Sequence, residues 1–158
     1  YHMDYNKEGR EDAFHSFAQA LQQLSGVVRQ LTEAETAKAE AAAAREHKRM
    51  DSFLKEEQAL ILKIRGLEQQ RDRHAAVLGW KGLTFRQVLK AASEEEAAVL
   101  SPIFSAMEEN LAQLTDAKET AGRIITTRLR EFELLLGTGS ADGAPGAEAP
   151  SYFHNKYV

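Results

Sequence analysis

The sequence contains no cysteine, which excludes disulfide bonds and thiolate metal sites and fits a reducing compartment. It has no run of the roughly 18 apolar residues that a membrane-spanning helix needs, and no signal peptide opens it. Basic and acidic residues alternate at a net charge of −4, so the basic patch of a nucleic-acid-binding surface is missing. We therefore expect a cytoplasmic protein that neither inserts into a membrane nor binds nucleic acid.

Motifs of the common catalytic sites are also missing, among them glycine-rich phosphate loops, nucleophile elbows and zinc-binding helix motifs. A di-iron helical bundle needs Glu-x-x-His on two helices, whereas the nearest match, Asp12-Ala-Phe-His15, occurs once and has the wrong acid. The acidic clusters at 94–96 and 108–109 are most simply charge at a helix start and on a solvent-exposed face. We predict that the protein is not an enzyme and holds no metal or cofactor.

Apolar residues at helical spacing dominate the stretch from Ser52 to Gly79. Spacings of three, four and seven are typical of a helix that buries one face, and here they join Phe53, Leu60, Ile64, Leu67 and Leu78. The opposite face carries charged side chains, namely Lys55, Glu56, Lys63, Glu68, Arg71, Asp72 and Arg73. Gly79 stands where a helix C-terminus is expected. A stripe of this length needs other helices to cover it.

A second stripe begins near Arg10 and alternates steps of three and four through Phe14, Phe17, Leu21, Leu24, Val28 and Leu31. Glu35, Lys38 and Ala42 continue the same spacing, but they add little apolar surface to the stripe. Residues 36–45 contain six alanines, so helix propensity stays high while the area available for packing falls. The pattern predicts a long first helix whose second half packs weakly.

The turn after this helix has no sequence marker, because no glycine or proline occurs between Gly26 and Gly66. A single rod over residues 10–78 would be roughly 100 Å long and would need a second copy to cover its stripe. A hairpin with its tip in residues 45–51, the most polar stretch, would let the two stripes bury each other. We favour the hairpin.

Two capping boxes mark the helices that follow. Thr84 and Gln87 open a short helix from Phe85 to about residue 92, and residues 93–96 form the second box. We expect the apolar Trp80 to close the end of the bundle. Pro102 either kinks a helix that begins at residue 93 or starts a new one.

The last helix has an apolar stripe with two interpretations. Its members are Ile103, Met107, Leu111, Leu114, Ala121, Ile124, Ile125, Leu129, Phe132, Leu135 and Leu136. Lys118 interrupts the stripe, and Gly137 marks the end of the helix. Either the whole stripe packs on the first two helices, or its C-terminal part lies beyond them and offers a face to a partner helix.

Residues 137–150 are rich in Gly, Ala and Pro, which predicts a flexible linker. The segment 151–158 then carries three aromatic residues, Tyr152, Phe153 and Tyr157, which would either bind a partner or dock on the bundle. We predict a helical domain over residues 1–137, with residues 1–2 a vector remnant, and a linker and tail over 138–158. The fold class is all-α: an elongated antiparallel bundle or coiled-coil hairpin, one short helix and a long C-terminal helix.

The order of these segments resembles the FlgN family of flagellar export chaperones. The family's second helix typically reads Lys-Glu-Glu-x-Leu, then Leu-x-x-Leu-x-x-x-Arg, and ends Leu-Gly. The matching residues here are Lys55, Glu56, Glu57, Leu60, Ile64, Leu67, Arg71, Leu78 and Gly79. The family's short Thr-Leu-Arg-x-Leu-like segment is similar to residues 84–89, and the resemblance covers most of residues 10–137. One departure is at residues 120–122, where the family often has asparagines.

The resemblance implies a cytoplasmic chaperone that binds C-terminal helical segments of hook-associated junction proteins and delivers them to the flagellar type III export gate. The candidate client-binding residues are Leu114, Ala121, Ile124, Ile125, Leu129, Phe132 and Leu136. In the family a tail tyrosine contributes to gate docking, and Tyr152 is the nearest equivalent, with Tyr157 second. The alternative function is a structural coiled-coil module that self-associates as a homodimer and has no export role.

Overall fold

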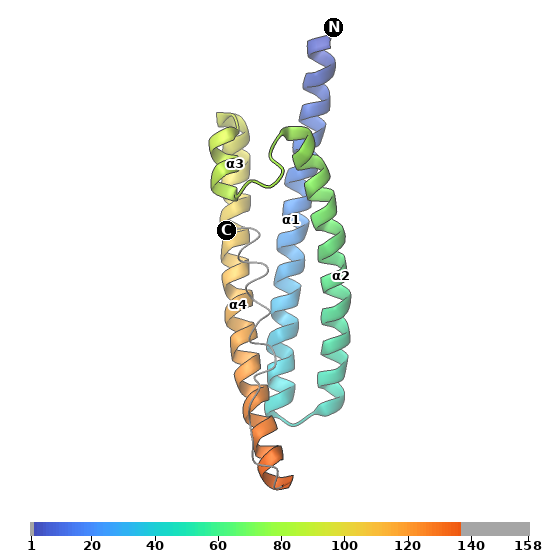
Figure 1. Ribbon diagram of the computed structural model, residues 1–158, viewed down its shortest axis with the longest axis vertical. Coiled ribbons are helices and arrows are strands. Elements are labelled where there is room, and N and C mark those ends of the chain that lie inside the picture. Colours follow the sequence, from blue (N-terminus) through green and yellow to red (C-terminus); the bar gives the residue numbers. More distant parts are fainter. Residues whose placement is uncertain (1, 137–158) are drawn as a thin grey trace.

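The computed structural model describes residues 2–136, with the side chains of 2–6, 132 and 136 excepted (Figure 1). The helices are, in chain order, α1 (His2–Ala43), α2 (His47–Leu78), α3 (Phe85–Ala91) and α4 (Glu94–Leu136). Among residues 2–136 there is no strand, and the long helices pack against one another. The predicted all-α fold is therefore confirmed.

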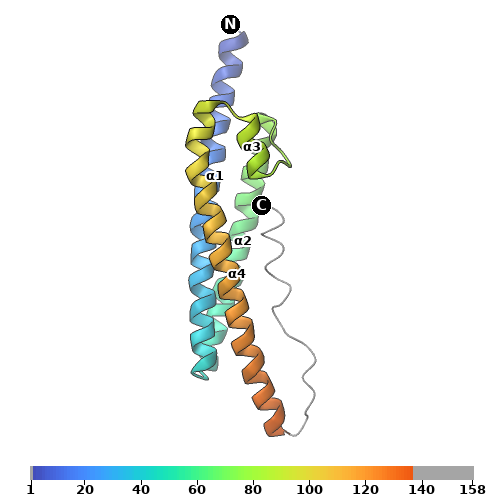
Figure 2. The ribbon, with the colours of Figure 1, turned by 90° about the vertical axis from the view of Figure 1, so that its left-hand side faces the viewer.

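Helix α1 is the central element of the bundle. It packs along α2 and along α4, while the short α3 lies against the beginning of α4 (Figures 1 and 2). The chain reverses between α1 and α2, so the predicted hairpin is confirmed and a continuous rod over residues 10–78 is excluded. Helix α1 also begins at His2 rather than near Arg10, and its first turns extend past the other helices (Figures 1 and 2). Once packing has nucleated a helix, each further turn costs little, which accounts for this extension.

The hairpin turn is formed by a residue that sequence patterns do not mark. Arg45 adopts a left-handed conformation with φ 61°. Its N–H donates to the carbonyl of Ala42 at 3.1 Å, and the N–H of Glu46 donates to that of Ala41 at 2.8 Å. This is the Schellman arrangement, in which glycine usually occupies the left-handed position. Because an arginine takes that position here, the turn has no glycine to announce it.

Helix α2 ends with the same motif, this time at a glycine. Gly79 has φ 80°, and its N–H donates to the carbonyl of Ala76 at 3.2 Å. The N–H of Trp80 donates to the carbonyl of Ala75 at 2.8 Å. The predicted end of the helix is therefore confirmed.

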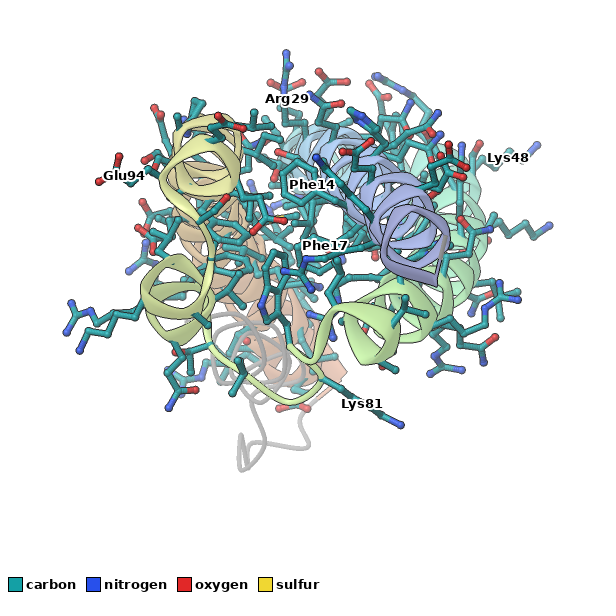
Figure 3. All side chains as sticks on the ribbon, turned by 90° about the horizontal axis from the view of Figure 1, so that it is seen from above. Phe14, Phe17, Arg29, Lys48, Lys81 and Glu94 are labelled. Carbon is teal, nitrogen blue, oxygen red and sulfur yellow. The ribbon has the colours of Figure 1, made fainter. Side chains whose placement is uncertain are left out.

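Apolar side chains from all four helices form one core. The α1 stripe is buried throughout, in Phe14, Phe17, Leu21, Leu24, Val28 and Leu31. Opposite it lie buried side chains of α2 and α4, among them Ile64, Leu67, Leu78, Leu100, Met107, Leu111 and Leu114. Seen along the bundle, Phe14 and Phe17 lie inward whereas Lys48, Lys81 and Glu94 point away (Figure 3). Burial of each large apolar side chain contributes about 1.5–3 kcal/mol.

Aromatic side chains close the end of the bundle near α3. Trp80 is 4% exposed and meets the rings of Phe14 and Phe17 edge-on, with centroids 6.2 and 5.4 Å away. The guanidinium of Arg10 lies 5.4 Å from the Trp80 ring centroid. The prediction that Trp80 closes this end is confirmed.

Both predicted capping boxes are present. Thr84 Oγ1 accepts from the N–H of Gln87, while Ser93 Oγ accepts from the N–H of Glu96. The helix that follows the second box continues through Pro102, so the alternative of a new helix starting there is wrong. Pro102 is exposed, which allows water to reach the carbonyl group that proline leaves without an N–H partner.

Candidate functional site

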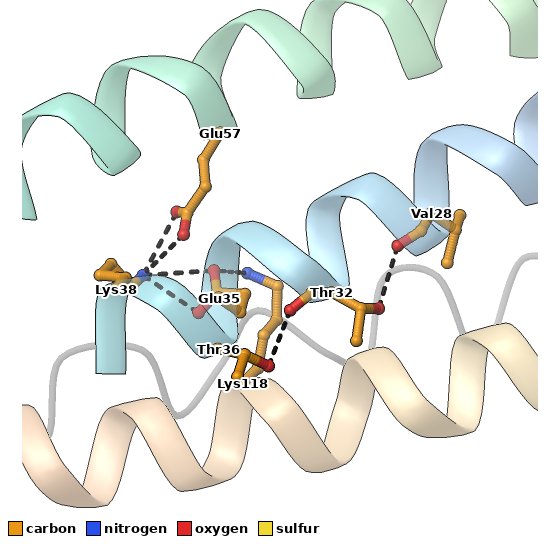
Figure 4. Close-up of polar contacts among 7 residues, drawn as sticks. All are labelled: Val28, Thr32, Glu35, Thr36, Lys38, Glu57 and Lys118. Carbon is orange, nitrogen blue, oxygen red and sulfur yellow. Dashed lines mark hydrogen bonds and ion pairs between the residues drawn. The ribbon is translucent and has the colours of Figure 1, made fainter. Parts of the chain in front are cut away.

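A cluster of four charged side chains lies inside the bundle, where the alanine-rich part of α1 provides little apolar area (Figure 4). Lys38 Nζ donates to Glu35 and to Glu57, at 3.2 Å each, and Lys118 Nζ donates to Glu35 at 3.1 Å. Glu35 is 1% exposed and Glu57 is 7% exposed. The cluster therefore joins α1, α2 and α4 through two carboxylates and two ammonium groups.

The two carboxylates of this cluster titrate differently. Burial raises the pKa of Glu57 to about 7, and the neighbouring Glu35 carboxylate adds to the rise by hydrogen bonding and by charge repulsion. Burial acts against the ionised form of Glu35 as well, but the hydrogen bond from Glu57 and the charges of Lys118 and Lys38 outweigh it and lower the pKa of Glu35. Near neutral pH the Glu57 carboxyl thus holds a proton for part of the time.

Helical spacing contained a signal for the buried acids, although their pairing could not be predicted. Glu35, Lys38 and Lys118 were expected as weak positions within apolar stripes, and they are the residues that pair. Glu68 was expected on the exposed face of α2, and this is wrong, because it is 3% exposed. Glu57 stands three residues before Leu60, and Glu68 follows Ile64 by four, so both lie in the register of the stripe.

Beyond the charged cluster the bundle opens into an apolar hollow between the hairpin tip and α4. The hollow has a volume of about 380 Å³. It is lined by Ala42, Arg45, His47, Met50, Ile125, Arg128, Leu129, Glu131 and Leu135. Its apolar wall comes mainly from α4, and α1 contributes the small side chain of Ala42. Because alanine fills little space opposite Ile125 and Leu129, the two helices leave room between them.

Charged side chains form the rim of the hollow and tie α4 to the hairpin tip. Arg128 donates to the backbone carbonyl of Ala43 at 2.9 Å, at the C-terminal end of α1 where a cation is favourable. Arg128 also donates to the Glu131 carboxylate at 2.9 Å, and Arg45 pairs with the same carboxylate at 3.4 Å. These contacts define the shape of the hollow in the free chain.

The last turns of α4 run past the hairpin tip (Figures 1 and 2). Leu129 is 40% exposed, Leu134 71% and Leu135 85%. Leu129 and Leu135 also line the hollow, so these two exposed leucines belong to the same apolar surface as the hollow. We call this the tip surface; it comprises the lining of the hollow. Large apolar surfaces left open in this way are typical of interaction sites.

The predicted client-binding residues divide into three groups. Leu114 and Ala121 are buried in the bundle, at 2% and 1% exposure. Ile124 and Ile125 are half-buried and Leu129 is exposed; Ile125 and Leu129 line the hollow. The backbones of Phe132 and Leu136 belong to α4, but their side chains lie outside the described residues, and so do Tyr152 and Tyr157. The sequence analysis missed the contribution of the hairpin tip, because the tip residues carry no motif.

No group of three or more His, Asp or Glu side chains within residues 2–136 is arranged to hold a metal ion. None of the helices in that range is long and apolar enough to cross a membrane.

Comparison with known proteins identifies the family. The model of the family described as "FlgN protein" matches residues 3–137, which include all four helices and the tip surface. No curated protein and no solved structure matches the chain. The match agrees with the resemblance seen in residues 55–89 and with the all-helical fold. The chain therefore belongs to the FlgN family of flagellar chaperones.

Proposed function

We propose that this chain is an export chaperone that binds the C-terminal helical segments of hook-associated junction proteins in the cytoplasm. It would deliver them to the flagellar type III export apparatus. The observation that carries the proposal is the tip surface, an apolar hollow that continues into the exposed leucines of α4. The family match supports the chaperone role, while the geometry supports the location of the client site.

We expect a client segment of this kind to form an amphipathic helix only on assembly. Before export its apolar face would be exposed and prone to premature association. A groove between helices can cover such a face by accepting the side chains that recur every three or four residues. The free energy spent on ordering the segment weakens the complex, and this keeps release at the export apparatus feasible.

The proposed contact residues are those of the predicted client-binding residues that the bundle does not fully cover. Ile124, Ile125 and Leu129 would meet the client directly, and Phe132 and Leu136 continue the same run of α4. Leu114 and Ala121 would support this face from the core, since both are covered by the bundle. Tyr152, with Tyr157 as the second candidate, would contact the export gate; this part of the proposal rests on the resemblance to the family.

The client site can be tested with a synthetic peptide that covers the C-terminal helical segment of a junction protein. Leu129→Glu places a charge in the hollow, and we expect the dissociation constant to rise roughly 10- to 100-fold, as expected when burial of one leucine is lost. Leu62→Glu is the control, because Leu62 is 65% exposed on α2 and does not line the hollow. Far-UV circular dichroism should give the same helicity for both variants.

If the Leu129→Glu and Leu62→Glu variants bind the client peptide equally well, the tip surface is not the client site. Sedimentation velocity at several concentrations tests the self-associating module. A dimer that persists on dilution, is broken by Leu129→Glu and binds no peptide would favour that module over the chaperone.

A further inference from the structure

The tip surface lies close in sequence to an aromatic segment of the same chain. Leu135 lines the hollow, and the sequence continues through a Gly/Ala/Pro-rich stretch, residues 137–150, to Tyr152, Phe153 and Tyr157. Large aromatic side chains suit an apolar hollow of about 380 Å³, since each can bury about 150–250 Å². The described side chains that line the hollow leave this volume open.

The length of the connecting stretch matches the distance that must be covered. A chain of this composition and of 14 residues (137–150) has a root-mean-square span of about 19–22 Å. The hollow occupies α4 between Ile125 and Leu135, about 15 Å along the helix at 1.5 Å per residue. The aromatic segment is thus held near the hollow at an effective concentration of the order of millimolar. A weak intrinsic affinity is sufficient for occupancy under these conditions.

The chemistry of the rim also suits aromatic side chains. Arg45 and Arg128 stand at the edge of the hollow, and guanidinium groups stack favourably on the faces of tyrosine and phenylalanine. The segment 151–158 contains no acidic residue that would compete with Glu131 for these arginines. The salt bridges of the rim can therefore persist beside a bound aromatic segment.

We propose that residues 151–158 of the same chain occupy the tip surface when no client is bound. The aromatic segment covers the exposed leucines in the free chaperone, and a client helix displaces it. Displacement makes the tail tyrosines accessible only in the loaded state, so that loading precedes docking at the export gate. The displacement of the tail by a client, and the order of loading before docking, rest on the function proposed above. The contact between the tail and the hollow does not.

The contact can be tested without a client. Since the chain has no cysteine, Ser151→Cys provides a single attachment site for a spin label on the full-length protein. In ¹⁵N-labelled protein we expect amide signals of residues 42–50 and 125–135 to weaken, and those of 79–93 to be unaffected. The matched control carries the same label with Tyr152, Phe153 and Tyr157 changed to serine, which keeps the tether and removes the aromatic groups. Signal intensity at the hollow should recover at least twofold in this control.

Equal weakening in the two proteins would overturn the proposal, because it would arise from the tether alone. As a test for contact between two copies, spin-labelled ¹⁴N protein is mixed with ¹⁵N protein that carries no spin label, and the ¹⁵N signals should be unchanged. Weakening of these signals in the mixture would overturn the intramolecular contact in favour of a second copy. Client peptide should bind the triple serine variant roughly three- to tenfold more tightly than the parent chain. If the tail contact is seen but the peptide binds away from the tip surface, the proposed client site fails and the tail contact stands.

Discussion

Replacement of Glu57 by glutamine is expected to change how the stability of the protein depends on pH. The pKa of this buried carboxyl is raised from an ordinary value of 4.5 to about 7 in the folded chain. Between these values the folded state binds a proton that the unfolded state has released, so the stability of the parent protein falls as pH rises. Glutamine cannot ionise, and the variant lacks this loss.

The magnitude follows from the two pKa values. The difference between 4.5 and 7, at about 1.4 kcal/mol per pKa unit, gives about 3–4 kcal/mol in total, of which about 2–3 kcal/mol falls between pH 5 and pH 8. Glu35 has the opposite sign: its lowered pKa stabilises the fold above about pH 4.5, and this contribution is lost as pH falls. Because Glu35 is present in both proteins, its contribution largely cancels in the comparison.

The assay is urea unfolding followed by far-UV circular dichroism at pH 5, 6, 7 and 8 at constant ionic strength. We expect Glu57→Gln to match the parent at pH 5 within about 0.5 kcal/mol, because at that pH an uncharged amide replaces a carboxyl group that is itself protonated and uncharged. At pH 8 the variant should be about 2–3 kcal/mol more stable. Glu56→Gln, on the exposed face of α2, is the control and should show no such trend. A stability difference for Glu57→Gln that stays constant from pH 5 to pH 8 would refute the reasoning.

Further predictions concern the hairpin turn, the core and a helix cap. Arg45→Gly should raise the free energy of unfolding by about 0.5–1 kcal/mol, because glycine adopts φ 61° without strain. The exposed ion pair with Glu131, which this change removes, contributes little. Arg45→Ala is the control and should show no gain in the same urea titration. Leu31→Ala should lower it by about 3–5 kcal/mol, since Leu31 is 0% exposed, and a urea midpoint within error of the parent would contradict the assigned core. Ser93→Ala removes the cap on the N–H of Glu96 and should cost about 1 kcal/mol, seen as a melting temperature roughly 2–4 °C lower.

The positions of most helices could be predicted from the sequence because the signals are local. The stripe from Phe14 to Leu31 repeats every three or four residues, and Thr84 and Ser93 precede residues that complete a capping box. Each of these patterns is completed within one or two turns of helix, so its physical meaning does not depend on the rest of the fold. The resemblance to the family likewise came from local patterns, in residues 55–79 and 84–89.

Contacts between distant segments could not be predicted in this way. The pairing of Lys38 with Glu57 depends on where the chain reverses, and the reversal at Arg45 uses a left-handed arginine that no pattern marks. The sequence likewise left open whether the C-terminal part of the α4 stripe is covered. That depends on the lengths of helices on either side of the turn.

The sequence by itself therefore determined which residues form helices, which face of each is apolar, and the family to which the chain belongs. Only the tertiary structure decided that α4 passes the hairpin tip and leaves Leu129 and Leu135 exposed beside a hollow. The physical reason is that periodicity defines an apolar face within one helix, whereas the burial of that face depends on a neighbour supplied from elsewhere in the chain.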